Sequence, residues 1–248
     1  MKSMNKLSVY KKIHYCFFSR NGGVSKNNFS SLNCAYGKGD LDENVLKNRE
    51  IASQLFKQTN LILPNQTHSN IVFNVEKMNE KNIFADALVS SRNDILLGML
   101  TADCAPIIVI GVNMYGIIHA GWRGVLNNII EKTIDKFISN GEKIKDLRIL
   151  VGPHLKKNSF EVKDDFIEEF NSKFHNFYKF LKITENKKFF DFSKIIESKI
   201  LDYGVKNLSV SKIDTFANPD NYFSHRYCSV NKIKNCGRQI SLVGIKNN

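Results

Sequence analysis

Four short apolar segments follow one another between residues 87 and 120, and they constrain the fold of this chain more than any other feature. They cover residues 87–89, 95–100, 106–112 and 115–120. Runs of this length and composition are typical of strands buried on both faces of a sheet. Helices must then cover the outer faces of such a sheet, so we expect a layered α/β fold.

Segments with helical spacing alternate with further strand-like segments. The clearest helix is predicted over 125–138, where apolar residues recur along one face and Gly141 follows as a stop. Other helices are predicted over 45–56, 164–170 and 192–201. Other strands are predicted over 13–19, 70–76, 147–151 and 208–213. No linker rich in Gly or Pro divides the chain, so the sequence predicts one domain over residues 1–248.

Several classes of protein are disfavoured by the sequence. No apolar run approaches the about 20 residues that a membrane-spanning helix needs, and no signal-peptide core follows the basic N-terminus. The five cysteines form neither a CxxC pair nor a disulfide pattern. We therefore expect a cytoplasmic protein that does not contact membranes, and the sequence gives no indication of its oligomeric state.

The net charge of +12 could indicate an anionic partner. However, the chain has 29 Lys and 29 Asn but only 7 Arg, a combination typical of an AT-rich coding bias. Grooves that bind nucleic acid favour Arg, and no run of five like charges occurs. Nucleic-acid binding is therefore not expected, although a basic nucleic-acid or partner-binding module stays open as an alternative.

Four polar segments adjoin predicted strands, where loops on a rigid scaffold commonly carry function. They are SRNGG (19–23) with SLN (31–33), QTHS (66–69), TADCAP (101–106) and HAGWRG (119–124). Within them, His68, Cys104 and His119 could bind one zinc ion and leave its fourth position open. Alternatively, His119 could activate Cys104 as a nucleophile. The residues alone leave both options open.

The spacing of Cys104 and His119 presents a geometric difficulty. A hairpin with a two-residue turn over Asn113 and Met114 would place His119 opposite Ile108 and Cys104 opposite Arg123. Four residues of offset along a strand is about 13 Å, which is too far for one metal ion. Either the two strands form a different pairing, or the loop that carries Cys104 folds back.

The polar segments, in this order, resemble the YfiH-like family, also called DUF152 or the laccase-domain (polyphenol oxidase) family. The resemblance includes ADALVS (85–90), VGP (151–153), FSHR (223–226) and GRQ (237–239), and it spans nearly the whole chain. The family is similar in fold to a deamidating cytotoxin domain. The resemblance therefore implies a layered α/β/β/α sandwich with mixed sheets.

The resemblance also implies a site and an activity. It gives His68, Cys104 and His119 as ligands of zinc, with copper as a less favoured metal. The activity it implies is phosphorolysis of inosine, guanosine or adenosine to the free base and ribose 1-phosphate. Related activities are adenosine deamination and phosphorolysis of 5′-methylthioadenosine. The expected partners are thus purine nucleosides and phosphate.

Other polar residues of the motifs are assigned expected roles. Arg123 or Arg20, each beside glycines, could bind phosphate. Asp103 could orient one of the ligand histidines or transfer protons. Asn33 and Gln66 are candidates for hydrogen bonds to the sugar or the base.

The chain departs from the family pattern near its C-terminus. His225-Arg226-Tyr227 replaces the usual Arg-Arg pair, and the segment before Gly237 is a few residues longer. Multicopper oxidation, which the laccase label implies, needs many more histidines than the six in this chain. A Cys-His hydrolase or amidase, with Cys104 as nucleophile and His119 as base, remains the alternative enzyme.

Overall fold

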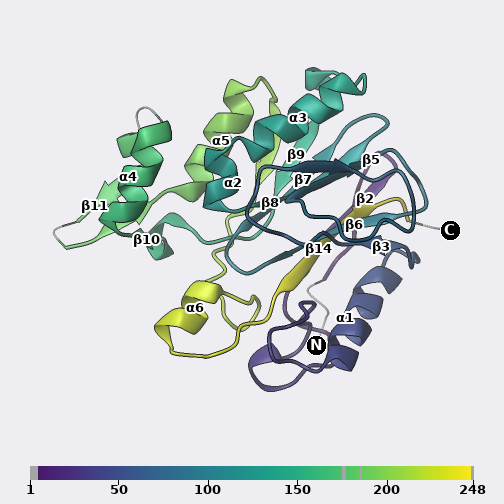
Figure 1. Cartoon of the computed structure of the whole chain (residues 1–248), viewed down its shortest axis with the longest axis horizontal. Coiled ribbons are helices and arrows are strands. Elements are labelled where there is room, and N and C mark those ends of the chain that lie inside the picture. The colour runs from purple at the N-terminus through teal and green to yellow at the C-terminus, as the bar shows by residue number, and fades with distance from the viewer. Residues whose placement is uncertain (1–4, 175–176, 185, 247–248) are drawn as a thin grey trace.

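Two stacked β-sheets form the centre of the protein in a computed structural model that describes residues 5–174, 177–184 and 186–246 (Figure 1). The larger sheet has the strand order β13-β9-β7-β8-β5-β4, and the smaller has the order β1-β2-β14-β6-β3. Both sheets mix parallel and antiparallel pairs. The strands of the larger sheet are β4 (Val72–Asn74), β5 (Ala87–Ser90), β7 (Ala105–Ile110), β8 (Tyr115–Ala120), β9 (Arg148–Val151) and β13 (Asn207–Val210). Those of the smaller are β1 (Ser8–Tyr10), β2 (Ile13–Phe17), β3 (Leu61–Ile62), β6 (Leu96–Thr101) and β14 (Gln239–Gly244).

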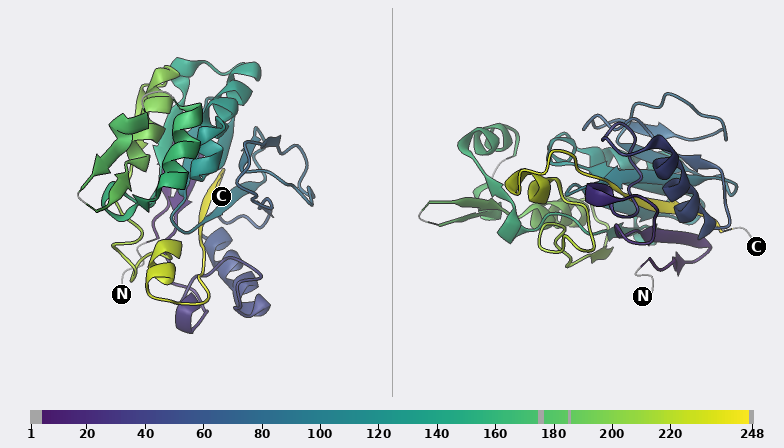
Figure 2. Two further views of the ribbon diagram at one scale, coloured as in Figure 1. Left: turned by 60° about the vertical axis from the view of Figure 1, so that its left-hand side comes forward. Right: turned by 90° about the horizontal axis from the view of Figure 1, so that it is seen from below.

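Helices cover the outer faces of the two sheets, as the views in Figure 2 show. On the larger sheet lie α2 (Trp122–Leu126), α3 (Ile129–Ser139) and α5 (Phe192–Asp202), whose apolar residues pack against its strands. On the smaller sheet lies α1 (Asp42–Gln54). The predicted α/β/β/α sandwich with mixed sheets is therefore confirmed.

Alternation along the strands explains why the apolar segments contain so few polar residues. In β8, Ile118 points toward the helices of the larger sheet, whereas Ile117 points into the core between the sheets. Both side chains are fully buried. A strand between two apolar layers needs apolar residues at consecutive positions, which is the pattern of the sequence.

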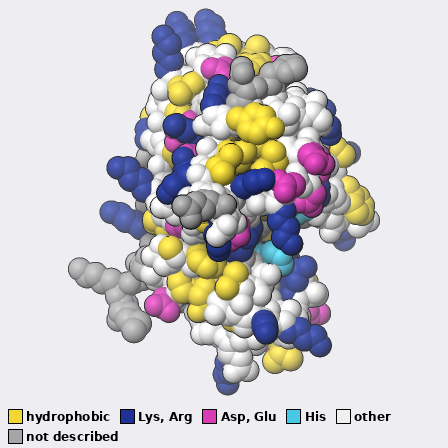
Figure 3. Space-filling model, turned by 90° about the vertical axis from the view of Figure 1, so that its left-hand side faces the viewer, with side chains coloured by type: hydrophobic (Ala, Val, Ile, Leu, Met, Phe, Trp, Pro, Cys, Tyr) yellow, Lys and Arg dark blue, Asp and Glu magenta, His cyan; other side chains and the backbone are white. Residues whose placement is uncertain are grey.

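A smaller unit of structure projects beside the helices of the larger sheet, at the left of Figure 1. This side of the molecule faces the viewer in Figure 3, which shows Lys and Arg side chains spread over its surface. The smaller unit combines the sheet β10-β12-β11 with α4, and a cluster of phenylalanine rings lies among them. The sequence analysis predicted the helix but not the short strands. The remaining elements are β10 (Glu161–Val162), α4 (Asp164–Lys173), β11 (Leu181–Ile183), β12 (Lys188–Phe190) and α6 (His225–Val230).

The helix predicted over 125–138 is two helices, so that prediction was wrong. The break falls between α2 and α3 at Asn128, whose φ of 67° lies in the left-handed region. The Asn128 side chain accepts a hydrogen bond from Lys199 in α5, which also pairs with Glu131. The contact with α5 is remote in sequence, and the apolar periodicity continues across the break, so periodicity alone could not reveal it. The predicted end of the helix is correct, because Gly141, with a φ of 87°, follows α3.

The turn between β7 and β8 also differs from the two-residue turn that the sequence analysis assumed for this hairpin. Ile110 is opposite Tyr115, so four residues form the turn, and Pro106 rather than Ile108 is opposite His119. The Glu142 carboxylate, 6% exposed, accepts hydrogen bonds from three backbone N–H groups of the turn, at 2.6–3.0 Å. This side chain fixes the register that places Cys104 near His119.

Replacing Glu142 with glutamine should destabilise the protein, because an amide cannot accept from three donors as a carboxylate does. We expect the free energy of unfolding to fall by about 1–3 kcal/mol, measured by denaturant unfolding. Glu50→Gln, which removes an exposed ion pair with Lys47, is the control and should change stability by less than about 0.5 kcal/mol. Equal effects of the two substitutions would contradict the role given to Glu142.

The other predicted elements are present, with ends within three residues of their predicted positions. In the part of the chain that the structure describes, no helix combines the length and apolarity needed to cross a bilayer.

Candidate metal centre

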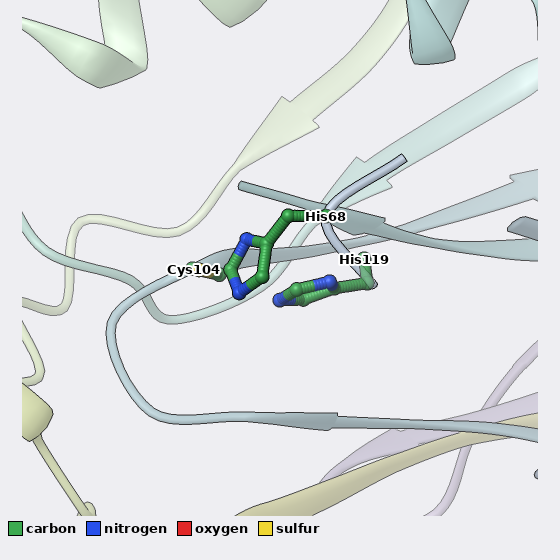
Figure 4. A group of neighbouring side chains, drawn as sticks. All are labelled: His68, Cys104 and His119. Carbon is green, nitrogen blue, oxygen red and sulfur yellow. The ribbon is translucent and has the colours of Figure 1, made fainter. Parts of the chain in front are cut away.

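Three side chains from different parts of the sequence converge at one end of the larger sheet (Figure 4). His68 lies in the loop between β3 and β4, Cys104 lies just before β7, and His119 lies near the end of β8. Their ligand atoms are all within 4.8 Å of one another. The two imidazole rings are 4.8 Å apart between centroids and inclined at 68°.

The hairpin register explains how Cys104 reaches His119. Ala105 is opposite Ala120, so Cys104 lies one position beyond the paired residues, next to Gly121. Gly121 follows His119 by two positions, which places both on the same face of the sheet. The spacing difficulty therefore disappears, because the true register is shifted by two residues.

Gly121 leaves the space that His68 occupies. A Cβ atom at this position would lie 2.6 Å from Nδ1 of His68 and 3.4 Å from Sγ of Cys104. A side chain here would therefore displace the imidazole ring. Glycine is needed at this position because it has no side chain, which permits the close approach of His68. Its backbone conformation is not the reason, because any residue can adopt the φ of −77°.

Gly121→Ala should therefore weaken metal binding while leaving the fold intact. We expect the dissociation constant for zinc to rise more than about tenfold, measured by competition with a chromophoric chelator. Gly141→Ala is the control, because no atom lies within 4 Å of the added methyl group and the residue is remote from the centre. The strain that alanine meets at a φ of 87° should lower stability, but it should leave zinc affinity unchanged. Unchanged zinc affinity in Gly121→Ala would show that His68 is not a ligand in this position.

Asp86 holds the three-residue segment that carries His68 and also holds His119. Its carboxylate is buried and accepts hydrogen bonds from the backbone N–H groups of Thr67, His68 and Ser69, at 2.6–3.1 Å. It also accepts one from the Ser69 hydroxyl at 2.7 Å and lies 2.7 Å from Nδ1 of His119. A carboxylate only accepts, so Nδ1–H of His119 donates and Nε2 is free to bind a metal.

The electrostatics of the centre favour a cation. Burial by itself raises the pKa of Asp86, but hydrogen bonds from His119 and Ser69 hold that pKa well below its usual range. Burial by itself lowers the pKa of His119, but the sulfur of Cys104 and the carboxylate of Asp86 raise it to about 9. Burial also lowers the pKa of His68, and the charge of His119 adds to this effect. A buried carboxylate and a thiol beside two imidazoles fit a metal cation, which would replace the proton on His119.

Asp103 lies next to Cys104, and its carboxylate is hydrogen-bonded to two more distant segments of the chain. Its carboxylate accepts hydrogen bonds from the Thr215 hydroxyl at 2.7 Å and from the backbone N–H of Arg226 at 2.6 Å. It therefore ties α6 to the loop of Cys104. Burial raises its pKa, although these hydrogen bonds oppose the shift. The orienting role that the sequence analysis offered to Asp103 is performed by Asp86.

Arg123 and Gln66 lie on segments that carry the ligands. Arg123 is exposed at the start of α2, two residues after Gly121, and its guanidinium lies 4.0 Å from the centroid of the Trp122 ring. The Gln66 amide both donates to and accepts from the backbone of Leu100, at 2.8 and 2.9 Å. Gln66 thus attaches the segment of His68 to the end of β6.

Arg20 and Asn33 make many hydrogen bonds within the protein. The Arg20 guanidinium donates to three backbone carbonyl groups and lies 4.4 Å from the Phe223 ring centroid. Asn33 is fully buried, and its side chain binds Ala35, Asp40 and the backbone N–H of Arg238. Both residues position loops, and their binding to a substrate stays a prediction.

Asp86 is the functional residue that the sequence analysis missed. It lies within ADALVS, a stretch quoted for the family resemblance, but it was not singled out. An aspartate directly before a strand that is buried on both faces was the available signal, because such a carboxylate must have partners. The identity of those partners depends on the sheet, since they are 17–33 residues away.

Comparison with known proteins assigns the chain to one family. The family described as multi-copper polyphenol oxidoreductase laccase matches residues 14–246. A purine nucleoside phosphorylase of Rickettsia prowazekii is 30% identical over 222 residues, which is 88% of this chain and 90% of that protein. Another from Bacteroides thetaiotaomicron is 28% identical over 247 residues, 91% and 90% of the two chains.

Solved structures agree with the fold. A Neisseria meningitidis protein assigned to DUF152 superposes with a TM-score of 0.87 at 25% identity, covering 98% of this chain and 99% of its own. Bacillus licheniformis YfiH superposes with a TM-score of 0.86 at 25% identity, covering 94% and 93%.

Proposed function

Because the chain belongs to the family described as multi-copper polyphenol oxidoreductase laccase, also known as DUF152 or YfiH-like, we propose that it is a zinc-dependent purine nucleoside phosphorylase. The convergence of His68, Cys104 and His119, with Asp86 behind them, carries this proposal. Two imidazoles and one thiolate are ligands that suit zinc, and three protein ligands leave one position for a reactant. The curated relatives that carry the name purine nucleoside phosphorylase support the choice of reaction.

In the proposed reaction, an oxygen of phosphate forms a bond to C1′ of the ribose as the bond from C1′ to the purine nitrogen breaks. The departing base gains a proton, and the products are the free base and ribose 1-phosphate. A bound zinc ion would supply Lewis acidity at its open position. Arg123, exposed beside the ligands, is proposed to stabilise the negative charge of the reacting groups.

Asp103 is the proposed proton-transfer group. Burial raises its pKa, which is the direction that lets a carboxyl group donate a proton near neutral pH. Its position next to Cys104 supports this role, and its bonds to Thr215 and Arg226 hold it in place. Adenosine deamination and phosphorolysis of 5′-methylthioadenosine are proposed as further activities of the same centre.

A Cys-His hydrolase is the second candidate. The observation that favours it is the interaction between Cys104 and His119, which raises the pKa of the imidazole. A base beside a thiol is the arrangement of a cysteine nucleophile. Such an enzyme would keep its activity in a chelator and lose it to a thiol-alkylating reagent. The third donor, His68, favours the metal instead.

The proposal is tested by incubating the purified protein with inosine and phosphate. We expect equal amounts of hypoxanthine and ribose 1-phosphate, no product without phosphate, loss of activity in a chelator, and recovery with zinc. Parallel reactions with adenosine, monitored for inosine, and with 5′-methylthioadenosine, monitored for adenine, test the further activities. Release of hypoxanthine without phosphate, or activity unaffected by metal removal, would contradict the proposal.

A further inference from the structure

A cavity of about 430 Å³ lies beside the loop that carries Cys104. One wall is the loop that contains Gly37, Lys38 and Gly39, and the other belongs to residues 225–238. The second wall includes the longer segment before Gly237 by which this chain departs from its family. Four lining residues are basic or can be protonated, namely Lys38, His225, Lys234 and Arg238, and none is acidic.

Buried contacts connect the two walls. The Asn33 side chain accepts a hydrogen bond from the backbone N–H of Arg238 and donates to Asp40, beside the first wall. Gly39 lies so close to Asn235 that an added Cβ would be 2.5 Å from its amide nitrogen. The cavity is therefore formed by packed loops.

Two backbone carbonyl groups orient the guanidinium of Arg238 and leave some of its N–H donors unused. Nη1 donates to the carbonyl groups of Cys236 and Gly237, both at 2.9 Å. Within the described part of the chain, no hydrogen bond involves its Nε or Nη2. Burial raises the pKa of the Cys236 thiol to about 12, so this lining residue adds no negative charge. The surroundings thus favour an anion.

The cavity adjoins the loop that carries Cys104. Cys228 and Cys236, which line the cavity, pack against Ala102, two residues before Cys104. A ligand in the cavity would therefore lie beside the loop that carries Cys104.

We propose that this cavity binds a phosphate oxyanion through Lys38, Lys234 and Arg238. A phosphate group carries two negative charges and several acceptor oxygens, which match the cationic donors of these side chains and the exposed backbone of a glycine-containing loop. The proposal rests on the proposed function in taking phosphate as a substrate. It also provides a site other than Arg20, whose guanidinium donors are used by backbone carbonyl groups. Inorganic phosphate and the phosphate group of ribose 1-phosphate share this chemistry.

The test measures binding of inorganic phosphate by phosphorus NMR at low ionic strength, without a nucleoside. Lys38→Gln and Lys234→Gln should each weaken binding by roughly fivefold to tenfold, as expected for a lost charge-assisted hydrogen bond. Lys232→Gln is the matched control, because it removes an exposed lysine from the same segment that does not line the cavity. The same titrations with ribose 1-phosphate show whether the free anion or the sugar phosphate binds more tightly.

The outcomes separate this proposal from the proposed function. Phosphate or ribose 1-phosphate binding that depends on Lys38 and Lys234 supports the site even if no nucleoside is cleaved. In an active enzyme, the same substitutions should raise the KM for phosphate by a similar factor with little change in the KM for inosine. Equal affinities in wild type, Lys232→Gln and the two cavity variants would overturn the proposal, whatever the activity.

Discussion

Replacing Cys104 with alanine is expected to abolish stable metal binding and to reduce phosphorolysis by more than about a hundredfold. Loss of a residue behind a ligand already costs roughly 10–100-fold in affinity or activity, and loss of the ligand itself should cost more. Alanine leaves only two imidazoles, and it removes the sulfur atom that helps to raise the pKa of His119. The measurements are metal content per chain and initial rates with inosine and phosphate.

Cys16→Ala is the control for Cys104→Ala. Cys16 is also a free cysteine, but it is buried in β2 of the smaller sheet, within the apolar core beneath α1. The Cys16→Ala variant should keep full metal content and activity, and its stability should fall slightly because packing in the core is lost. The account of the centre fails if Cys104→Ala retains one metal ion per chain and turns over inosine at the wild-type rate.

Asp86→Asn should have the second-largest effect, although Asp86 does not bind the metal. The carboxylate accepts hydrogen bonds from the segment of His68 and from His119 at the same time. An amide has one oxygen, so its NH₂ group would face donors. We expect zinc affinity to fall by about 10–100-fold and the free energy of unfolding of the metal-free protein to fall by about 2–4 kcal/mol.

Two measurements separate these effects of Asp86→Asn. Chelator competition gives the zinc affinity, and denaturant unfolding of the metal-free protein gives the stability. Asp94→Asn is a suitable control, because Asp94 is a half-exposed carboxylate paired with Arg92 and does not contact the centre. If Asp86→Asn binds zinc as tightly as wild type, then Asp86 does not position the ligands.

The larger features of the fold could be predicted because they depend on local pattern. The strand over 115–120 has its predicted bounds, since every residue of β8 is buried and the apolar run ends where the sheet ends. The break before α3 depends on Lys199, and the hairpin turn depends on Glu142, so neither could be inferred from neighbouring residues. The β10-β12-β11 sheet has strands of two or three residues, too short for an alternation to stand out.

The residues of the candidate site, too, could be predicted only in part. His68, Cys104 and His119 were identified by the resemblance, whereas the spacing of Cys104 and His119 argued against a shared site. The structure resolves the conflict through a turn that is two residues longer than assumed. Asp86 was missed because its partners are gathered only when β5 pairs with β8.

X-ray absorption spectroscopy of the purified protein tests the central claim most directly, because it reports the atoms bound to a metal without requiring turnover. The account predicts one zinc ion per chain, with one sulfur ligand at about 2.3 Å and two imidazole nitrogens at about 2.0 Å. Zinc added in excess to Cys104→Ala should show no sulfur ligand. A protein that binds no metal, or a metal surrounded only by oxygen and nitrogen in the wild type, would contradict the claim that these three side chains form one metal centre.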